Sequence, residues 1–410
     1  MRAPAKRAFC ALLALALAAS FAGCEEVVPD EPAAATPVES AQPSEDQRRA
    51  RERGRALVER FQCNRCHTID EVAEPAPSQN CLGCHRAIEA GTFEASEDDL
   101  ERWRSHITNL VAAPSLLSVG ARLRPAWITA FLLEPKDLRP ALGASMPRLP
   151  MSEDEAQDIA AFLTRDAGAF EAIPERALVA AGRRAFERLA CGACHVFRDA
   201  EIPEQAQPEG DDGARLAPDL AHVRERFVSG RLAEWIANPS AMKHDTLMPS
   251  AASAEQARAL AAYLWHAPLR PVRQTPPPLL PILERRVSYE EVNEHIFHRT
   301  CRHCHADADL AFGDGGPGND GGFGFERRGL NLTNYEGASA GVLVDGRRTS
   351  IYAPDASGMP RLVHALRARQ LEEVGERDPT ITGMPLAHPA VSPEDLQLVR
   401  TWVAQGRLRF

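Results

Sequence analysis

The chain has 410 residues, of which 44 % are hydrophobic and 25 % are charged, and its formal net charge is -10 at pH 7. This length is too great for one compact core, so we expect about three domains, each with its own interior. The acidic balance argues against nucleic acid as a partner and permits the docking of a basic protein.

The N-terminus has the pattern of an export signal. Three basic residues precede an apolar run over residues 8–20, which is too short to cross a bilayer as a mature helix. The segment Phe21-Ala22-Gly23-Cys24 follows and resembles the lipobox of bacterial lipoproteins, although Phe21 stands in place of the usual Leu. We therefore expect a signal peptide over residues 1–23 and a lipid on Cys24, with ordinary secretion as the alternative.

Residues 24–50 are predicted to form a disordered tether, because they are rich in Pro, Ala, Glu, Ser and Gln and lack apolar periodicity. The lipid and the tether would hold the remainder of the chain on the periplasmic side of the cell envelope. Glu25 follows the lipid site where an inner-membrane retention signal would have Asp, which favours the outer membrane.

A Cys-x-x-Cys-His motif occurs four times along the chain. The two thiols of such a motif can form thioethers with one porphyrin, and the adjacent histidine then lies under the iron. Zinc sites and redox disulfides also use Cys-x-x-Cys pairs, but neither explains a histidine after every second cysteine. The sequence therefore predicts four covalently attached haem c groups. Their residues are Cys63, Cys66 and His67; Cys81, Cys84 and His85; Cys191, Cys194 and His195; and Cys301, Cys304 and His305.

The motifs use eight of the ten cysteines. Cys10 leaves with the predicted signal peptide and Cys24 is the predicted lipid site, so no cysteine remains for a disulfide. Exported proteins are usually the ones that carry disulfides, and here covalently bound haem would take over the cross-linking of each small core.

Three units of the chain share one pattern. In the first two, a segment with helical apolar spacing leads into the motif and has Gly nine residues ahead of the first Cys, whereas the third unit has Val292 there. Each unit later has Met-Pro and then a helix start with a capping serine and acidic residues in the first turn. The glycines are Gly54 and Gly182, and the serines are Ser152, Ser253 and Ser392.

We divide the chain accordingly. The first domain covers residues 51–168 and carries two haems, the second covers 175–268 and carries one, and the third covers 287–410 and carries one. Residues 269–286 form a Pro-rich linker with three consecutive prolines, which we expect to be a semi-rigid spacer.

These units resemble the class I cytochrome c family, and the likeness covers almost all of the mature chain. The resemblance implies a mostly α-helical fold with three such domains in tandem. In that family the helix before the motif crosses the C-terminal helix where a glycine faces an aromatic residue. By that resemblance, Gly54 would meet the region of Phe162, and Gly182 the region of Tyr263 or Trp265. Trp402 would take this place in the third domain.

The resemblance also implies that a methionine on a loop is the second axial ligand of the iron. Met146, Met248 and Met384, each followed by Pro, are the candidates, and core packing is the other role open to a Met. A thioether opposite histidine favours ferrous iron and raises the potential. Met359, which also precedes a Pro, is the rival of Met384, but its following residues show no capped terminal helix.

The second motif has no Met-Pro block of its own and is predicted to hold an extra haem in a loop of the first domain. His106, in an expected helix over residues 98–110, is the first candidate for its sixth ligand. Met151 is another candidate, and the position could also be open or held by water. A bis-histidine haem would have a lower potential than its neighbours.

With both axial positions filled, a haem moves electrons without catalysing bond chemistry. The sequence therefore predicts a tetrahaem cytochrome that carries electrons between redox proteins at the cell envelope. One alternative is an oxidoreductase, peroxidase-like or acting on sulfur or nitrogen compounds, with an open haem at His85. Another is a cytochrome subunit of a larger membrane redox complex. Residues 313–324 match one calcium-binding repeat, but a single copy cannot stack, so we expect a flexible loop there.

Overall fold

The computed structural model describes residues 42–107, 112–135, 138–140, 142, 146–166, 172–199, 212–270, 275–306 and 322–409. The predicted signal peptide, Cys24 and most of the predicted tether lie outside these ranges. Among the described residues, no helix is both long enough and apolar enough to cross a membrane.

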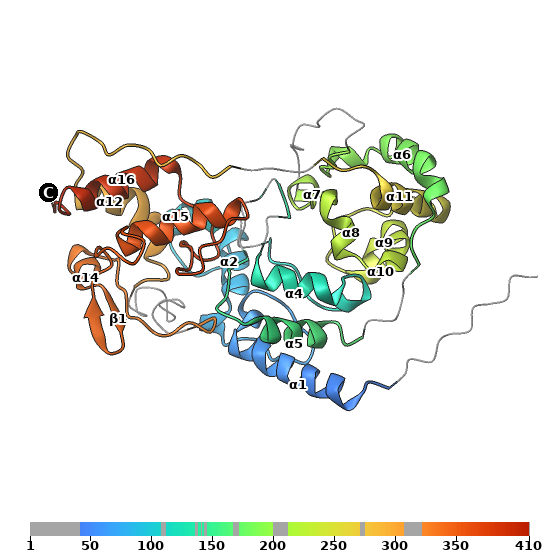
Figure 1. Ribbon diagram of the computed structural model, residues 1–410, viewed down its shortest axis with the longest axis horizontal. Coiled ribbons are helices and arrows are strands. Elements are labelled where there is room, and N and C mark those ends of the chain that lie inside the picture. Colours follow the sequence, from blue (N-terminus) through green and yellow to red (C-terminus); the bar gives the residue numbers. More distant parts are fainter. Residues whose placement is uncertain are drawn as a thin grey trace, which may run out of the picture. The chain divides into compact units, whose positions relative to one another are not determined.

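The described part of the chain is mostly helical (Figure 1). In the first predicted domain the α-helices are α1 (Glu45–Arg60), α2 (Cys81–Glu89), α3 (Glu97–Ile107), α4 (Pro125–Leu133) and α5 (Glu153–Leu163). In the second they are α6 (Val179–Arg188), α7 (Asp212–Arg215), α8 (Val223–Arg226), α9 (Leu232–Ala237), α10 (Pro239–Met242) and α11 (Ala254–His266). In the third they are α12 (Tyr289–Val292), α14 (Tyr335–Ala340), α15 (Arg361–Glu373) and α16 (Pro393–Ala404).

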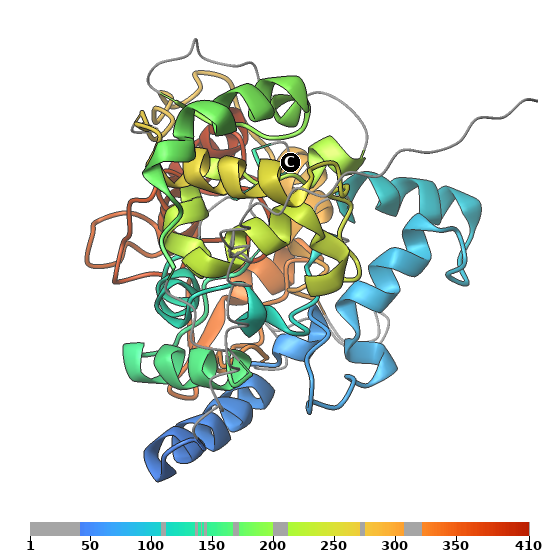
Figure 2. The same cartoon turned by 90° about the vertical axis from the view of Figure 1, so that its right-hand side faces the viewer.

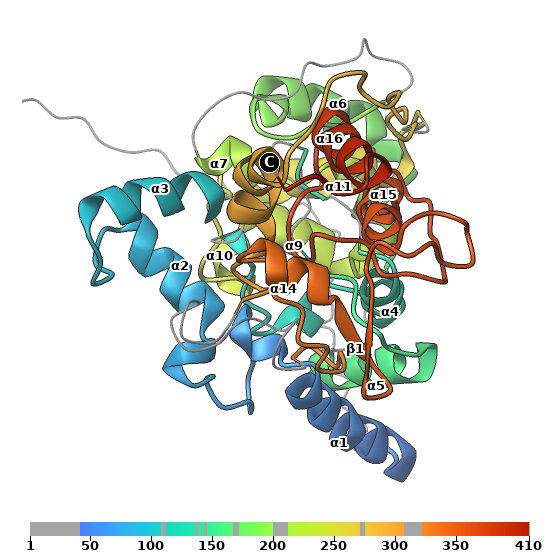
Figure 3. The same ribbon diagram turned by 90° about the vertical axis from the view of Figure 1, so that its left-hand side faces the viewer.

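Two short strands form an antiparallel hairpin in the third predicted domain. Strand β1 (Val342–Val344) pairs with β2 (Arg347–Thr349), and Val342 lies opposite Thr349. The hairpin follows α14 and precedes α15, and all of these elements come before α16 in the chain (Figure 3). The sequence pattern predicted none of them.

Helix α1 begins earlier than expected. Residues 24–50 were predicted to be a tether, but Ser44 caps a helix that starts at Glu45, and Gln47 completes a capping box with Ser44. The two reciprocal hydrogen bonds satisfy backbone donors that would otherwise be unpaired at the helix start. The tether prediction is therefore wrong for residues 45–50.

Helices α1 and α5 cross at Gly54, as the resemblance implied (Figure 1). A Cβ atom at Gly54 would lie 2.0 Å from the carbonyl oxygen of Asp158 and 2.8 Å from Cβ of Phe162. Only a residue without a side chain allows the two backbones to approach this closely.

Helices α6 and α11 repeat this crossing in the second predicted domain (Figure 2). A Cβ atom at Gly182 would lie 2.0 Å from the carbonyl oxygen of Ala259 and 2.7 Å from Cβ of Tyr263. Tyr263 is the aromatic residue at the crossing, and its hydroxyl group donates a hydrogen bond of 2.7 Å to the buried carboxylate of Asp199.

The first two predicted domains are joined by equivalent segments. Leu123 and Phe227 form an antiparallel bridge, flanked by hydrogen bonds from Arg124 N to Arg226 O (2.8 Å) and from Val228 N to Arg122 O (2.9 Å). One apolar core runs through both regions, from Val58 to Ala267, and also includes Phe323, while the third region has a second core of its own. The described residues beyond position 42 thus form one compact unit and not a series of separate domains.

In the third region the chain enters the motif through a π-helix (Asn293–Cys301) that continues α12. Trp402 on α16 is fully buried and contacts the rings of Tyr289 and Phe297. The indole ring of Trp402 therefore contacts the helix before the motif, as predicted. Val292 is buried at the position where the other two predicted domains have Gly.

The described part of the Pro-rich linker lies along α15 and α16 and is not a free spacer. Extended Pro-rich backbone leaves its carbonyl groups unpaired within the segment. Side chains of the two helices satisfy them: Arg367 donates to Pro277 O (2.6 Å), Arg400 to Leu280 O (2.6 Å) and Gln397 to Pro281 O (2.6 Å).

Candidate haem sites

The four motifs share one local geometry. In three of them the backbone N–H of the histidine donates to the backbone carbonyl of the first cysteine at 3.0 Å. The remaining motif begins helix α2. Residues i, i+3 and i+4 of a helical turn lie on one face, so each turn presents two thiols and one imidazole together. That is the set of groups needed for two thioethers and an iron ligand on one porphyrin.

The motif cysteines are all free thiols in the described part of the chain. Burial raises the pKa of Cys63 and of Cys301 to about 12, so both are neutral near pH 7. A zinc site uses thiolates, whereas a buried neutral thiol suits covalent attachment to a haem vinyl group.

Two of the motif histidines are oriented in the same way. His67 Nδ1 lies 2.7 Å from Pro114 O, and His195 Nδ1 lies 2.9 Å from Pro218 O. A carbonyl oxygen can only accept, so Nδ1 carries the proton and Nε2 keeps its lone pair for a metal. The segments Ala113-Pro114-Ser115-Leu116 and Ala217-Pro218-Asp219-Leu220 share an Ala-Pro-x-Leu pattern, which the sequence analysis missed.

The third predicted domain departs from this arrangement. His305 Nδ1 is buried and has no hydrogen-bond partner among the described residues, while the backbone carbonyl of His305 accepts from Leu332 N at 2.8 Å. Burial lowers the pKa of His305 to about 4, so its imidazole is neutral at physiological pH. Neutral imidazole is the form that binds iron.

The second motif lies on a helix, and the expectation of a loop was wrong. Asn80 caps α2 by accepting a hydrogen bond from Gly83 N at 2.7 Å, which starts the helix within the motif itself. The thiol of Cys66, from the first motif, is hydrogen-bonded to that of Cys81, and this contact, followed by burial, raises the pKa of Cys66. The first and second motifs are therefore direct neighbours.

Two further histidines lie close to His85. Burial, and then the nearby imidazoles of His303 and His388, lower the pKa of His85 to about 4. The ring of His303 is 6.4 Å from that of His85 between centroids, at an interplanar angle of 52°. The backbone of His106, the ligand predicted for this haem, belongs to α3, and its side chain lies outside the described part. Sequence reasoning missed His303, although a histidine inside a haem motif could have signalled it.

The predicted methionine ligands pack against the same apolar cores as their motif cysteines. Met146 and Met248 contact the core that includes Cys63 and Cys191, and Met384 contacts the core that includes Cys301. Met151, the other candidate for the second motif, packs against the same core as Met146.

The rival Met359 lies at a different place in the third predicted domain. It precedes α15, and the expectation that no helix follows it was wrong, because α15 starts at Arg361 without a side-chain cap. Unlike Met384, Met359 is absent from the core around Cys301. The backbone N–H of Met384 donates to Ala365 O on α15 at 2.9 Å, which places Met384 beside that helix.

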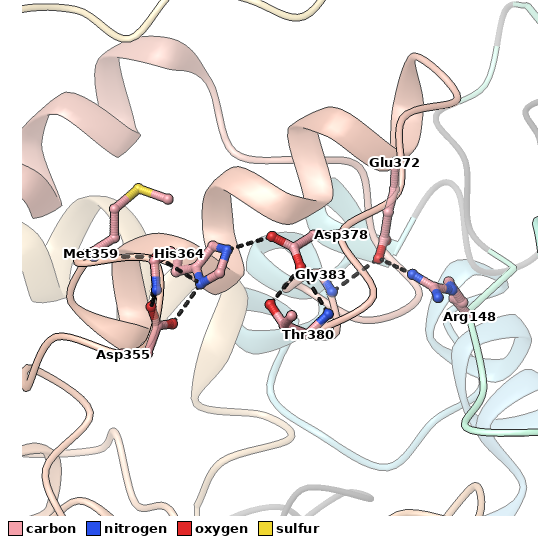
Figure 4. Close-up of polar contacts among 9 residues, drawn as sticks. Arg148, Asp355, Met359, His364, Glu372, Asp378, Thr380 and Gly383 are labelled. Carbon is pink, nitrogen blue, oxygen red and sulfur yellow. Dashed lines mark hydrogen bonds and ion pairs between the residues drawn. The ribbon is translucent and has the colours of Figure 1, made fainter.

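An ionic network holds the loop that leads to Met384 (Figure 4). His364 on α15 is buried between Asp355 (2.5 Å) and Asp378 (2.7 Å). Burial opposes a charge on His364, but the two carboxylates outweigh it and raise its pKa. Glu372 accepts hydrogen bonds from Gly383 N (3.0 Å) and from Arg148 (3.3 Å). Arg148 follows the Met146-Pro147 pair, so this carboxylate connects two methionine loops.

Buried arginines lie between the first two motifs. Arg122 and Arg226 are equivalent, each eight residues after the proline that accepts from a proximal histidine. Arg122 lies over the ring of Trp235 (5.6 Å) and Arg226 over that of Trp127 (5.0 Å), each in the other predicted domain. Burial lowers the pKa of both guanidinium groups to about 10, so they stay charged at neutral pH.

These arginines provide a test of whether haem fits. The Nε atoms of Arg122 and Arg226 are buried without a hydrogen-bond partner among the described residues. The acid near Arg122 is Asp245, which pairs with Lys243 at 2.6 Å, and the acid near Arg226 is Glu225, which pairs with His222 at 2.5 Å. Buried charged donors require anions. The propionate carboxylates of haem supply such anions, so the residues around His67 and His195 fit the group.

The end of the glycine-rich stretch is packed rather than free. Its residues 313–321 lie outside the described ranges, but Phe323 N donates to Gln62 Oε1 at 3.3 Å and the Phe323 ring lies 5.5 Å from the guanidinium of Arg65. Gly324 has φ +78°, and a Cβ there would lie 2.5 Å from the ring of Phe61. The flexible-loop expectation is therefore wrong for residues 322–324, which cover the first motif.

Comparison with known proteins identifies one part of the chain. The Cytochrome c family model matches residues 179–268, from the start of α6 to just beyond α11. No curated protein and no solved structure matches the chain. Residues 179–268 are thus a cytochrome c domain, which implies attachment of haem c and electron transfer through it.

Proposed function

We propose that this chain is a tetrahaem c-type cytochrome that carries electrons between redox proteins at the cell envelope. The observation that carries the proposal is the repetition of the His195 site around His67. Both sites have the same thiol turn, the same imidazole-to-prolyl hydrogen bond and an equivalent buried arginine. Because the second of them belongs to a cytochrome c domain, the first has the features of the same cofactor site.

The proposal assigns the eight motif cysteines to thioethers and the four motif histidines to the proximal position. Met146, Met248 and Met384 are the distal ligands of the haems at His67, His195 and His305. When bound, the haem supplies a one-electron couple. The prolyl carbonyls of Pro114 and Pro218 orient the imidazoles of His67 and His195. With methionines as the second ligands, these sites would transfer electrons without catalysing bond chemistry.

The proposal includes the location and the partners of the protein. Export through the signal at residues 1–23, followed by acylation of Cys24, would hold the head on the periplasmic side of the outer membrane. Redox proteins, or a membrane redox complex of which this chain is a subunit, would then be the partners. Labelling with a radioactive fatty acid tests the anchor, since the label should be lost in Cys24→Ser.

The decisive experiment counts haems on the purified full-length protein and records their spin states. Intact mass and the pyridine haemochrome assay should give four haems per chain, and electron paramagnetic resonance should show low-spin ferric iron only. In the variant Cys81→Ala/Cys84→Ala the count should fall to three, with the other signals unchanged. Fewer than four haems in the unaltered protein, or bound zinc, would overturn the proposal. One high-spin haem per chain with turnover of a small substrate would favour the oxidoreductase alternative.

A further inference from the structure

His303 lies inside the last haem motif but on the wrong side of it to serve that haem. Cys301, Cys304 and His305 share one face of the turn, closed by the bond from His305 N to Cys301 O. The residue two positions after the first cysteine lies about 200° around a helical turn, on the opposite face. His303 thus faces away from its own porphyrin site, and the ring it approaches is that of His85.

The separation of these two rings matches a shared metal. Their centroids are 6.4 Å apart. An imidazole nitrogen lies about 1.1 Å from the ring centroid, given ring bonds of about 1.35 Å. A metal–imidazole bond is about 2.0–2.1 Å long, so two imidazoles on one metal have centroids about 6.3 Å apart. A direct hydrogen bond of about 2.9 Å between the rings would give only about 5.1 Å.

The surroundings of the two rings also fit a haem between them. His85 is buried, whereas the side chain of His303 is exposed, so its ring is accessible to a ligand. The interplanar angle of 52° poses no obstacle, because each axial imidazole can turn about its own bond to the iron.

We propose that His303 is the sixth ligand of the haem attached at Cys81, Cys84 and His85. The inference rests on the proposed function, since it requires a haem at the second motif. It fills the position that would otherwise be open, and it makes this haem bis-histidine, with the lowest potential of the four. His303 precedes Cys304, which carries the next haem, so one peptide bond links the iron ligand of one haem to the thioether of another.

The test replaces His303 in the haem-loaded full chain. The third motif already has an alanine, Ala193, at the position that His303 takes in the last motif. His303→Ala should therefore retain haem attachment. His106→Ala and His388→Ala are the matched controls, since the first is the candidate from sequence and the second is the other imidazole beside His85. Near-infrared magnetic circular dichroism and electron paramagnetic resonance distinguish ligation by two nitrogens from ligation by nitrogen and sulfur.

We expect one bis-histidine haem per chain in the unaltered protein and in both controls. In His303→Ala that signal should be lost and one high-spin ferric haem should appear, and in His303→Met the lowest of the four potentials should rise. Loss of the bis-histidine signal in His106→Ala or His388→Ala, but not in His303→Ala, would overturn the assignment. Four attached haems in that case would leave the proposed function standing, whereas fewer than four in the unaltered protein would refute the function itself.

Discussion

Gly182→Ala tests the helix crossing that positions the second haem domain. The new Cβ would lie 2.0 Å from Ala259 O, and real Cβ contacts essentially never fall under 3.0 Å, so α6 and α11 must separate by about 1 Å or more. The shift also moves Tyr263, whose hydroxyl bonds to buried Asp199. Overpacking of this kind costs about 1–3 kcal/mol. In a helix interior Ala is otherwise better than Gly by about 1 kcal/mol, so the packing cost has to exceed that gain.

Hydrogen exchange measured by mass spectrometry on the haem-loaded full chain provides the readout. We expect peptides from α6 and α11 to lose up to about 30-fold of their protection, because the packing cost less the helix-propensity gain is at most about 2 kcal/mol and about 1.4 kcal/mol corresponds to tenfold. Arg184→Ala, an exposed change on the same helix, should leave protection nearly unchanged. Gly54→Ala should show the loss in α1 and α5 instead. Equal or greater protection in Gly182→Ala would refute the close crossing.

Three further predictions concern the haem environments. Met384→Leu should abolish the methionine–iron absorption band of one haem and lower its potential, whereas Met359→Leu should leave the spectrum unchanged; the opposite result would make Met359 the ligand. Arg226→Gln should lower a haem potential by about 40–90 mV in redox titration, because removing the positive charge takes away about 1–2 kcal/mol of electrostatic free energy that favours ferrous iron. An unchanged or higher potential would argue against propionates at this site. His364 has a raised pKa in the folded state, so its stabilising contribution is complete below about pH 6.5 and is lost as the pH rises through that raised value. Hydrogen-exchange protection near Gly383 should fall as the pH rises through the raised pKa of His364, and His364→Gln should remove this pH dependence.

Helix starts with a polar cap were predictable from the sequence because the signal is local. Ser152, Ser253 and Ser392 all accept a hydrogen bond from the backbone N–H three residues later, as their spacing predicted. Ser44 and Gln47 carry the same signal, and the composition of the surrounding tether concealed it. Helix α15 begins after Pro360 without any side-chain cap, so cap-based reasoning could not find it.

The motif residues form an equally local signal, since thioether attachment would fix their spacing within five residues. The neighbours of each haem site are brought together by the tertiary fold, and no local pattern records them. His303 approaches His85 only because the third region packs against α2. Arg122 and Arg226 could have been found from sequence, because both follow the Ala-Pro-x-Leu pattern at the same distance.

In the proposed protein, the contacts between sites define an order for the four haems that differs from their order in the sequence. The paired arginines connect the sites of His195 and His67, the Cys66–Cys81 thiol contact connects His67 with His85, and His303 connects His85 with His305. In the proposed protein, electrons would therefore pass from the second domain through both haems of the first to the third. The bis-histidine haem then lies inside this series, and its potential would be lower than those of its methionine-ligated neighbours. Partners would exchange electrons at the two ends, near His195 and His305.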